Sequence, residues 1–378
     1  DTAQYKLDHA GDTISPTTAI LNEVSSFEHD DNVRPVAAGK FAYFAQARTN
    51  NTAIREYYSD DDTLTNDGLD ISVSVQTLIP TNAYQIISNT VEDCLAILCS
   101  DTADAQVVPY SAGSDVTATN ADTMYIYKYF FDGGEKVQTA WSKWEFTGVK
   151  ILGGFSIESN IYLFTAEGQT TKLFKVDLRN LKDATLGFGV YLDKMVSVTG
   201  TYSSGTGLTT LTSPYGAKTG LMAVDKTDGT DYALTNTSGS TYTLVGNHTS
   251  LWIGTPYESK YTLSQQYIRE NTGRGLLAVT TGRYQIRNIA LTYENSGFFT
   301  AEVTPENRST STTVMNGYVL GTSGSTIGAP ALHSGTIKVP IQCRNTDFTF
   351  DIISSSHLPM YVASAEIEGY YHNRATRI

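Results

Sequence analysis

Residues 125–146 read YIYKYFFDGGEKVQTAWSKWEF, which is two runs of aromatic and polar residues around a Gly133-Gly134 pair. Adjacent glycines accept the positive φ angles of a tight turn, so this stretch predicts a β-hairpin. We expect Asp132 to lie opposite Glu135. That register sets three further cross-strand pairs, which are Tyr127 with Ala140, Ile126 with Trp141, and Phe130 with Val137. Because side chains alternate along a strand, both faces carry large apolar groups, and the hairpin should be covered on both sides by stacked sheets.

The composition of the whole chain also favours strands. The 378 residues include 24 Tyr, 14 Phe and 31 Gly, and Thr and Ser are frequent throughout. Tyr, Thr and Val favour strands, whereas Gly, Asn, Asp and Ser favour turns. Few stretches have a helical period. We therefore expect a mainly β protein with many short strands and very little helix, divided into two or three domains.

The formal net charge of −13, from 26 Lys+Arg and 39 Asp+Glu, limits the possible partners. Affinity for nucleic acid phosphates comes from Lys and Arg, so an acidic body does not wrap nucleic acid tightly. Two interpretations remain open. The charge keeps the protein in solution, or it lets DNA slide past without adhering.

The three cysteines, Cys94, Cys99 and Cys343, predict neither a disulfide framework nor a zinc site, because their number is odd and they form no C-x-x-C pair. Cys94 and Cys99 lie in an apolar run and are expected to be small core residues. The sequence contains no run of about 18 apolar residues, so it predicts no membrane-spanning segment. The first residues lack a start Met and a signal-peptide pattern, so we expect a fragment of a longer protein.

Three segments of the first half share a weak repeat of paired strands, at residues 36–58, 86–131 and 151–178. Phe44, Leu98 and Phe164 end the first strand of each segment, at spacings of 54 and 66 residues. Paired-strand repeats of about 40–50 residues are typical of β-propeller blades, here with insertions. We expect propeller-like blades over residues 1–185, with a generic β-meander as the alternative.

Two further antiparallel β domains are expected after these repeats. Residues 186–254 become rich in Thr, Ser and Gly, and their turn at 225–231 should hold a positive φ at Gly229. Residues 255–378 contain longer extended runs and predict a C-terminal β platform domain. In the run at 283–294, alternation places Tyr284, Ile286, Asn288, Ala290 and Thr292 on one face, and Arg287, Ile289, Leu291 and Tyr293 on the other.

No sequence motif for catalysis, cofactor binding or metal binding was found. The six His residues are scattered without an H-E-x-x-H pair, and no nucleophile elbow, P-loop or dinucleotide fingerprint occurs. The acidic stretch at residues 60–68 fails the EF-hand spacing, because Leu64 stands where an oxygen ligand is needed, so we expect a solvated turn. We assign no catalytic, cofactor-binding or metal-ligating residue.

Two groups of charged residues were considered as sites. Glu366 and Glu368 lie two residues apart on a predicted strand and share one face. Paired carboxylates of this kind can hydrolyse sugars, although solvated strand carboxylates are commoner. The densest basic cluster consists of Arg269, Arg274, Arg283 and Arg287. We expect a subunit interface there rather than a ligand site, since nothing nearby in the sequence completes a pocket.

Four stretches resemble the tail nozzle proteins of short-tailed phages, also called the tail tubular protein B family. They are PYESKYTLSQQYIR at 256–269, GRYQIRNIALTYENSGFFTAEV at 282–303, LPMYVASAEIEGYYHNRATR at 358–377, and the hairpin at 125–146. The resemblance covers most of the chain from about Val33 onward, in patches. An aromatic residue stands in the family where this chain has Ile367. Family members are usually much longer at the N-terminus.

The resemblance implies a virion structural protein rather than an enzyme, made in the host cytoplasm and built into the phage tail. Such subunits form a six-fold ring below the tail adaptor ring and support the tail fibres. They conduct and gate double-stranded DNA without sequence-specific binding, and no cofactor is implied. Acidic side chains facing a lumen would repel phosphates over about 8–10 Å. The alternative is a carbohydrate-binding or carbohydrate-hydrolysing β-propeller protein, with a β-rich surface adhesin as a weaker option.

Overall fold

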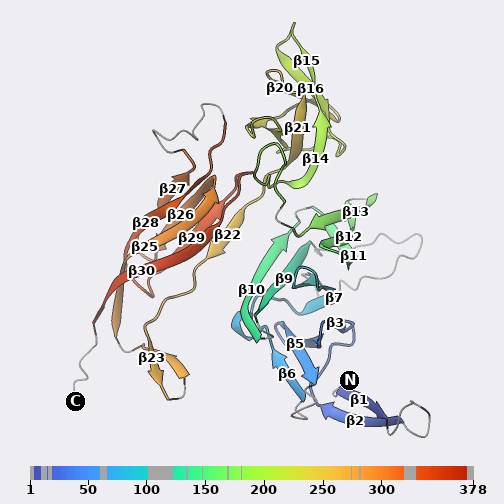
Figure 1. Cartoon of the computed structure of the whole chain (residues 1–378), viewed down its shortest axis with the longest axis vertical. Coiled ribbons are helices and arrows are strands. Elements are labelled where there is room, and N and C mark those ends of the chain that lie inside the picture. Colours follow the sequence, from blue (N-terminus) through green and yellow to red (C-terminus); the bar gives the residue numbers. More distant parts are fainter. Residues whose placement is uncertain are drawn as a thin grey trace. The chain divides into compact units, whose positions relative to one another are not determined.

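The computed structural model describes residues 4–9, 15, 19–59, 66–100, 122–132, 135–146, 148–167, 170–179, 181–273, 275–280, 282–318 and 329–372. Within these ranges the only helical segment is the short 3-10 helix η1 (Val73–Val75), and the other elements are strands (Figure 1). This confirms the mainly β fold with very little helix. The chain divides into two compact units, residues 1–179 and 180–378.

Unit 1 consists of antiparallel sheets whose strands follow the order of the chain. A hairpin pairs β1 (Gln4–His9) with β2 (Ala19–Ser25). The first sheet contains β3 (Val36–Ala38), β4 (Phe41–Ala47), β5 (Thr52–Ser59) and β6 (Asn66–Asp70). The second sheet contains β7 (Asn82–Asn89), β8 (Cys94–Ser100), β9 (Thr123–Asp132) and β10 (Glu135–Glu145). The third sheet contains β11 (Lys150–Ile157), β12 (Asn160–Glu167) and β13 (Thr170–Asp177).

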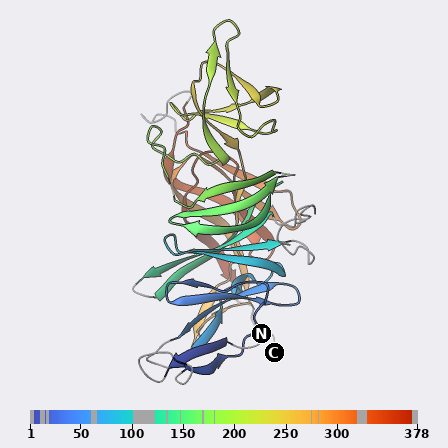
Figure 2. The same ribbon diagram turned by 90° about the vertical axis from the view of Figure 1, so that its right-hand side faces the viewer.

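The three sheets of unit 1 stack face to face with the second sheet in the middle, as Figure 2 shows. One apolar core lies between the first and second sheets and includes Tyr43, Ile54, Leu95 and Tyr127. Another lies between the second and third sheets. It includes Cys94, Leu98, Met124, Ile151 and Leu163. All seven residues of β8 are buried, as expected for a strand covered on both faces.

The 125–146 hairpin forms as predicted, but with a different register. Asp132 lies opposite Glu135, and the pairing then skips Val137, which is the extra residue of a β-bulge. The three further predicted pairs are therefore wrong by one residue, since Tyr127 faces Trp141, Ile126 faces Ser142 and Phe130 faces Gln138. Cover on both sides is confirmed for most of β9, whereas β10 is a largely exposed edge strand. Gly133 and Gly134 lie outside the described residues.

The paired strands of the weak repeat are confirmed. They are β4 with β5, β8 with β9, and β12 with β13, and each pair is antiparallel. Phe44, Leu98 and Phe164 lie on the corresponding strands β4, β8 and β12. None of the sheets in the described ranges closes on itself. The structure therefore gives stacked meanders, and a propeller arrangement is not established by it.

Unit 2 begins with two four-stranded sheets that share one apolar core. One sheet has the order β14 (Asp193–Thr199), β21 (Ser250–Thr255), β17 (Met222–Asp225) and β18 (Asp231–Ala233). The other has the order β15 (Thr201–Ser203), β16 (Leu208–Thr212), β20 (Thr241–Val245) and β19 (Thr235–Ser238). The turn between β17 and β18 has φ +81° at Gly229, which confirms the positive φ predicted there.

The rest of unit 2 contains a β-sandwich, meaning two sheets that enclose a second apolar core. One sheet has the order β22 (Ser259–Thr262), β29 (Phe348–Ser354), β26 (Phe298–Pro305) and β27 (Ser311–Asn316). The other has β25 (Arg283–Ser296) between β28 (His333–Arg344) and β30 (Val362–His372). A separate hairpin pairs β23 (Arg269–Thr272) with β24 (Gly275–Ala278).

Strand β25 departs from simple alternation because it too contains a bulge. Its pairing with β30 skips Arg287, so Ile286 turns to the same face as Ile289 and joins it in the sandwich core. The predicted face is therefore wrong for Tyr284 and Ile286, which both pack toward the core. The prediction holds for the residues after the bulge, because Ile289, Leu291 and Tyr293 are buried.

The two parts of unit 2 are tied together by a buried histidine. His357 is 2% exposed, and its Nε2 donates to the carbonyl oxygen of Gly229 at 2.9 Å. The backbone N–H of Tyr191 donates to the carbonyl of His357 at 2.8 Å, and the Tyr191 and Tyr361 hydroxyls are 2.7 Å apart. A side chain at Gly229 would meet Phe188 at 2.7 Å, so the turn needs glycine for space as well as for its backbone angle.

Candidate functional surfaces

Lys136, at the turn end of β10, occupies a cage of aromatic rings between the first two sheets of unit 1. Its ammonium lies 5.2–5.8 Å from the ring centroids of Phe41, Tyr43, Tyr127, Tyr129 and Phe131, and it pairs with the Glu56 carboxylate. Burial raises the pKa of Tyr129 to about 12, and burial is also the main cause that raises the pKa of Tyr43. The cage joins the hairpin to the first sheet, which is a structural role.

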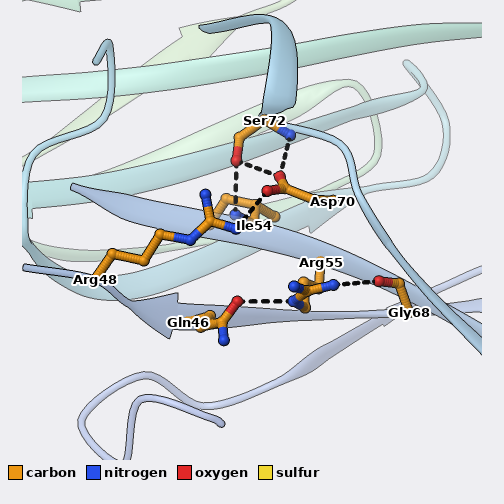
Figure 3. A network of polar contacts seen from close by, with 7 residues as sticks. All are labelled: Gln46, Arg48, Ile54, Arg55, Gly68, Asp70 and Ser72. Carbon is orange, nitrogen blue, oxygen red and sulfur yellow. Dashed lines mark hydrogen bonds and ion pairs between the residues drawn. The ribbon is translucent and has the colours of Figure 1, made fainter. Parts of the chain in front are cut away.

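A polar network fixes the end of β6 against β5 (Figure 3). Asp70 accepts hydrogen bonds from Arg48 Nη2 at 2.6 Å and from the hydroxyl and backbone N–H of Ser72 at 2.6 and 2.9 Å. Burial alone would raise the pKa of Asp70, but the bonds from Ser72 and Arg48 outweigh it and hold the pKa below its usual value. Ser72 in turn accepts from the Ile54 N–H at 3.2 Å. All residues of the network belong to unit 1, so the network stabilises that unit.

Aromatic and aliphatic side chains are exposed on the outer face of the third sheet of unit 1. Phe155 stacks on Tyr162 with ring centroids 5.2 Å apart and contacts Phe164 at 5.7 Å. Phe164 is 45% exposed and faces Leu173 on β13, which is 54% exposed. A continuous exposed group of this kind on a sheet is typical of a surface that packs against another element.

The carboxylates Glu366 and Glu368 both lie on the outer face of the β28-β25-β30 sheet, opposite Ala290 and Asn288. Both are exposed, and the Asn288 amide donates to Glu368 at 3.3 Å. Among the described residues, neither glutamate lines either of the two hollows considered below. Their exposure on one strand face is the position expected of solvated strand carboxylates.

A hollow beside the 125–146 hairpin brings together Glu92, Asp93, Lys128 and Phe130. Phe130 is 58% exposed, and Asp93 has φ +49° in the turn between β7 and β8. Glu92 and Asp93 are consecutive in that turn. These residues belong to no sequence motif, and we assign them no chemistry.

The described arginines of the predicted cluster come from two elements, β23 and β25. Arg269 lies on the β23-β24 hairpin, Arg287 forms the bulge of β25, and Arg274 lies outside the described residues. Arg283 instead lines a hollow of about 390 Å³ at one end of the sandwich with Arg308 and Arg344. Sequence reasoning missed the last two, because they come from the β26-β27 turn and the end of β28 and meet Arg283 only in the folded sandwich.

Histidine and cysteine side chains have structural positions. His248 Nδ1 donates to Asp225 at 2.7 Å. Burial would raise the pKa of Asp225, but bonds from Thr227 and His248 keep that pKa below its usual value.

Cys94 and Cys99 are buried core residues as predicted, and burial raises the pKa of Cys94 to about 11. Across the described ranges, no three His, Cys, Asp or Glu side chains are grouped to hold a metal ion. Nor does any described helix have the length and hydrophobicity to cross a membrane.

Solved structures that resemble the chain do so only weakly. An exo-β-1,3-galactanase from Phanerochaete chrysosporium with galactose has a TM-score of 0.25 and 9% identity, covering 97% of this chain and 100% of that chain. A variant of that enzyme with β-1,3-galactotriose has a TM-score of 0.25 and 10% identity, covering 96% and 100%. Scores this low carry no argument about fold or activity.

Comparison with known sequences gives a clear result. The curated tail tubular protein gp12 of Escherichia phage T7 is 26% identical over 398 residues, covering 100% of this chain and 48% of that protein. The chain thus spans about half the length of this relative. The family model described as bacteriophage nozzle protein matches residues 1–378. The resemblance seen in the sequence is confirmed, and the chain belongs to the bacteriophage nozzle protein family.

Proposed function

We propose that the chain is a structural component of a phage tail, located in the virion and acting as part of the nozzle of the tail tube. The observation that carries the proposal is the family match over residues 1–378, supported by the tail tubular protein of phage T7. Copies form a six-fold ring that conducts and gates DNA during ejection, below an adaptor ring and in contact with tail fibres. The chain is not an enzyme in this proposal, which agrees with the solvated positions of Glu366 and Glu368.

The distribution of charge supports passage of DNA without adhesion. Residues 1–179 carry 25 Asp+Glu and 12 Lys+Arg, a net charge of −13, whereas residues 180–378 carry 14 of each and are neutral. The net negative charge of the chain thus belongs to unit 1. We assign the DNA-repelling wall of the channel to this unit, where like charges keep phosphates away over about one Debye length, ~8–10 Å.

The three stacked sheets of unit 1 are proposed to be blades of a propeller-like arrangement over residues 1–185, followed by domains at 186–254 and 255–378. Successive sheets pack face to face, and the exposed Phe155, Phe164 and Leu173 offer the third sheet's outer face to a further four-stranded sheet of the same kind. A tail map should show such a sheet against Phe164. Bulk solvent at that face would contradict the arrangement.

Imaging of the virion tail by electron cryomicroscopy tests the main proposal. Six copies of the chain around an axial channel, below the adaptor ring, are the expected result. A tail map without this chain, or with the chain present but away from any channel, would end the proposal.

A further inference from the structure

We propose that the arginine-lined hollow at the end of the sandwich is a binding site, which receives an acidic segment of unit 1 from a second copy of the chain. The inference rests on the proposed ring, because it names one contact between neighbouring subunits. Three elements supply the arginines, namely the start of β25 for Arg283, the β26-β27 turn for Arg308 and the end of β28 for Arg344.

The walls of the hollow are fixed before any partner binds. Arg308 Nη2 donates to the carbonyl of Gln342 at 3.2 Å and to Cys343 Sγ at 3.0 Å. The Asp347 N–H donates to the Arg344 carbonyl at 3.0 Å, and the Glu306 N–H donates to the Asp347 carbonyl at 3.0 Å. The turns that carry Arg308 and Arg344 are thereby joined. A preorganised site of this kind loses little conformational entropy on binding.

The three guanidinium groups keep N–H donors for a partner, although Nη2 of Arg308 also holds the wall of the hollow. Arg283, Arg308 and Arg344 are exposed, and within the described ranges none of them forms an ion pair with a carboxylate. Glu306 and Asp347 line the same hollow without pairing with them. By contrast, Arg48 and Arg179 in unit 1 are paired with Asp70 and Asp177. The hollow therefore presents forked N–H donors suited to carboxylate or phosphate oxygens.

The other lining residues favour a peptide over a nucleic acid. Glu306 and Asp347 would repel a continuous phosphate backbone, but their oxygens can accept backbone N–H groups of a peptide. The side-chain amides of Gln285, Asn307 and Gln342 line the hollow as well. Each can donate or accept a hydrogen bond, with either the backbone or the side chains of a bound peptide. A second copy supplies the required carboxylates, because unit 1 has a net charge of −13 and unit 2 is neutral.

Self-association of the full chain tests the site. Wild type, an Arg308→Glu/Arg344→Glu variant and a Lys338→Glu control, at an exposed position of β28 outside the hollow, are compared by mass photometry over a range of salt concentrations, with thermal unfolding as the check on folding. We expect the dissociation constant for self-association of the double variant to rise by about tenfold or more, and that of the control to match wild type. An Arg308→Lys/Arg344→Lys variant keeps the charge without the forked geometry, so it should fall between the two and serves if the Glu variant misfolds.

The outcomes separate this inference from the ring itself. If wild type and both double variants assemble equally, the proposed contact at the hollow is wrong and the proposed ring is unaffected. If wild type never associates, both the contact and the ring are contradicted. Binding of a DNA duplex is measured in parallel by fluorescence anisotropy. Loss of duplex binding in the double variant with unchanged assembly would show a phosphate site instead and overturn the proposal.

Discussion

At the scale of single residues, the most consequential pair is Lys136 with Glu56. The Lys136 side chain is 16% exposed and that of Glu56 is 7% exposed, so each depends on the other for its charge to be tolerated inside the aromatic cage. We predict that Lys136→Met or Glu56→Gln alone costs about 3–5 kcal/mol, because one charged or polar partner is left unpaired in the cage.

Chemical denaturation of unit 1 followed by tryptophan fluorescence measures this cost. The double variant Lys136→Met/Glu56→Leu should be close to wild type in stability, because no charge is left unpaired. Lys143→Met, which breaks the exposed Lys143–Glu145 pair, is the matched control and should cost less than about 1 kcal/mol. Similar losses from Lys136→Met and Lys143→Met would contradict the role of the cage.

His357 predicts how unit 2 responds to acid. Burial lowers the pKa of His357 in the folded chain, so the unfolded chain, with a pKa of about 6.5, binds a proton that the folded chain resists. Stability is therefore full above about pH 6.5 and falls as the pH drops below it. Thermal unfolding between pH 8 and pH 5 should show this loss in wild type and a flatter profile in His357→Gln, whose amide can still donate to Gly229. Parallel profiles would exclude His357 as the source.

At the scale of elements, local pattern predicted the strands and their pairing but not their bulges. Local signals were sufficient to predict which strands pair. They are the alternation around Gly133-Gly134 and the paired runs at β4-β5, β8-β9 and β12-β13. Val137 and Arg287 each add one residue that no alternation reveals, since Val137 shares its parity with Trp141 yet is 57% exposed. Arg308 and Arg344 stayed hidden for a related reason, because only tertiary packing brings turns distant in sequence to Arg283.

The bulge itself can be tested by deletion. Removing Val137 leaves Lys136 opposite Phe131 and Gln138 opposite Phe130, which is the register already present. We expect the deletion to cost about 1 kcal/mol or less and to keep Trp141 packed on Tyr127, whose ring centroids are 4.8 Å apart. Insertion of one alanine after Val137 is the control. It should destabilise more, because a second extra residue must either enlarge the bulge or shift the register of the residues after it. Tryptophan emission and unfolding free energy report both, and a deletion as costly as the insertion would contradict the bulge.

At the scale of the whole molecule, the separation of charge between the units predicts weak contact with DNA. With a net charge of −13 in unit 1 and a neutral unit 2, the chain should show no duplex binding tighter than about 100 µM at physiological salt. Fluorescence anisotropy with a labelled duplex measures this, and an unrelated basic DNA-binding protein serves as the positive control. Micromolar binding would contradict a channel that DNA passes without adhering.

The chain-order arrangement of the sheets in unit 1 has a consequence for biosynthesis. Each strand of a sheet pairs with the strand translated just before or after it, so most pairs close a short loop at a small cost in entropy, and the 22 residues at 101–122 between β8 and β9 are the longest such connection. Every sheet can therefore form soon after its last strand leaves the ribosome. In the proposed tail role, a cell that makes many copies within one burst would gain from such vectorial folding, because fewer nascent chains expose unpaired edges to one another.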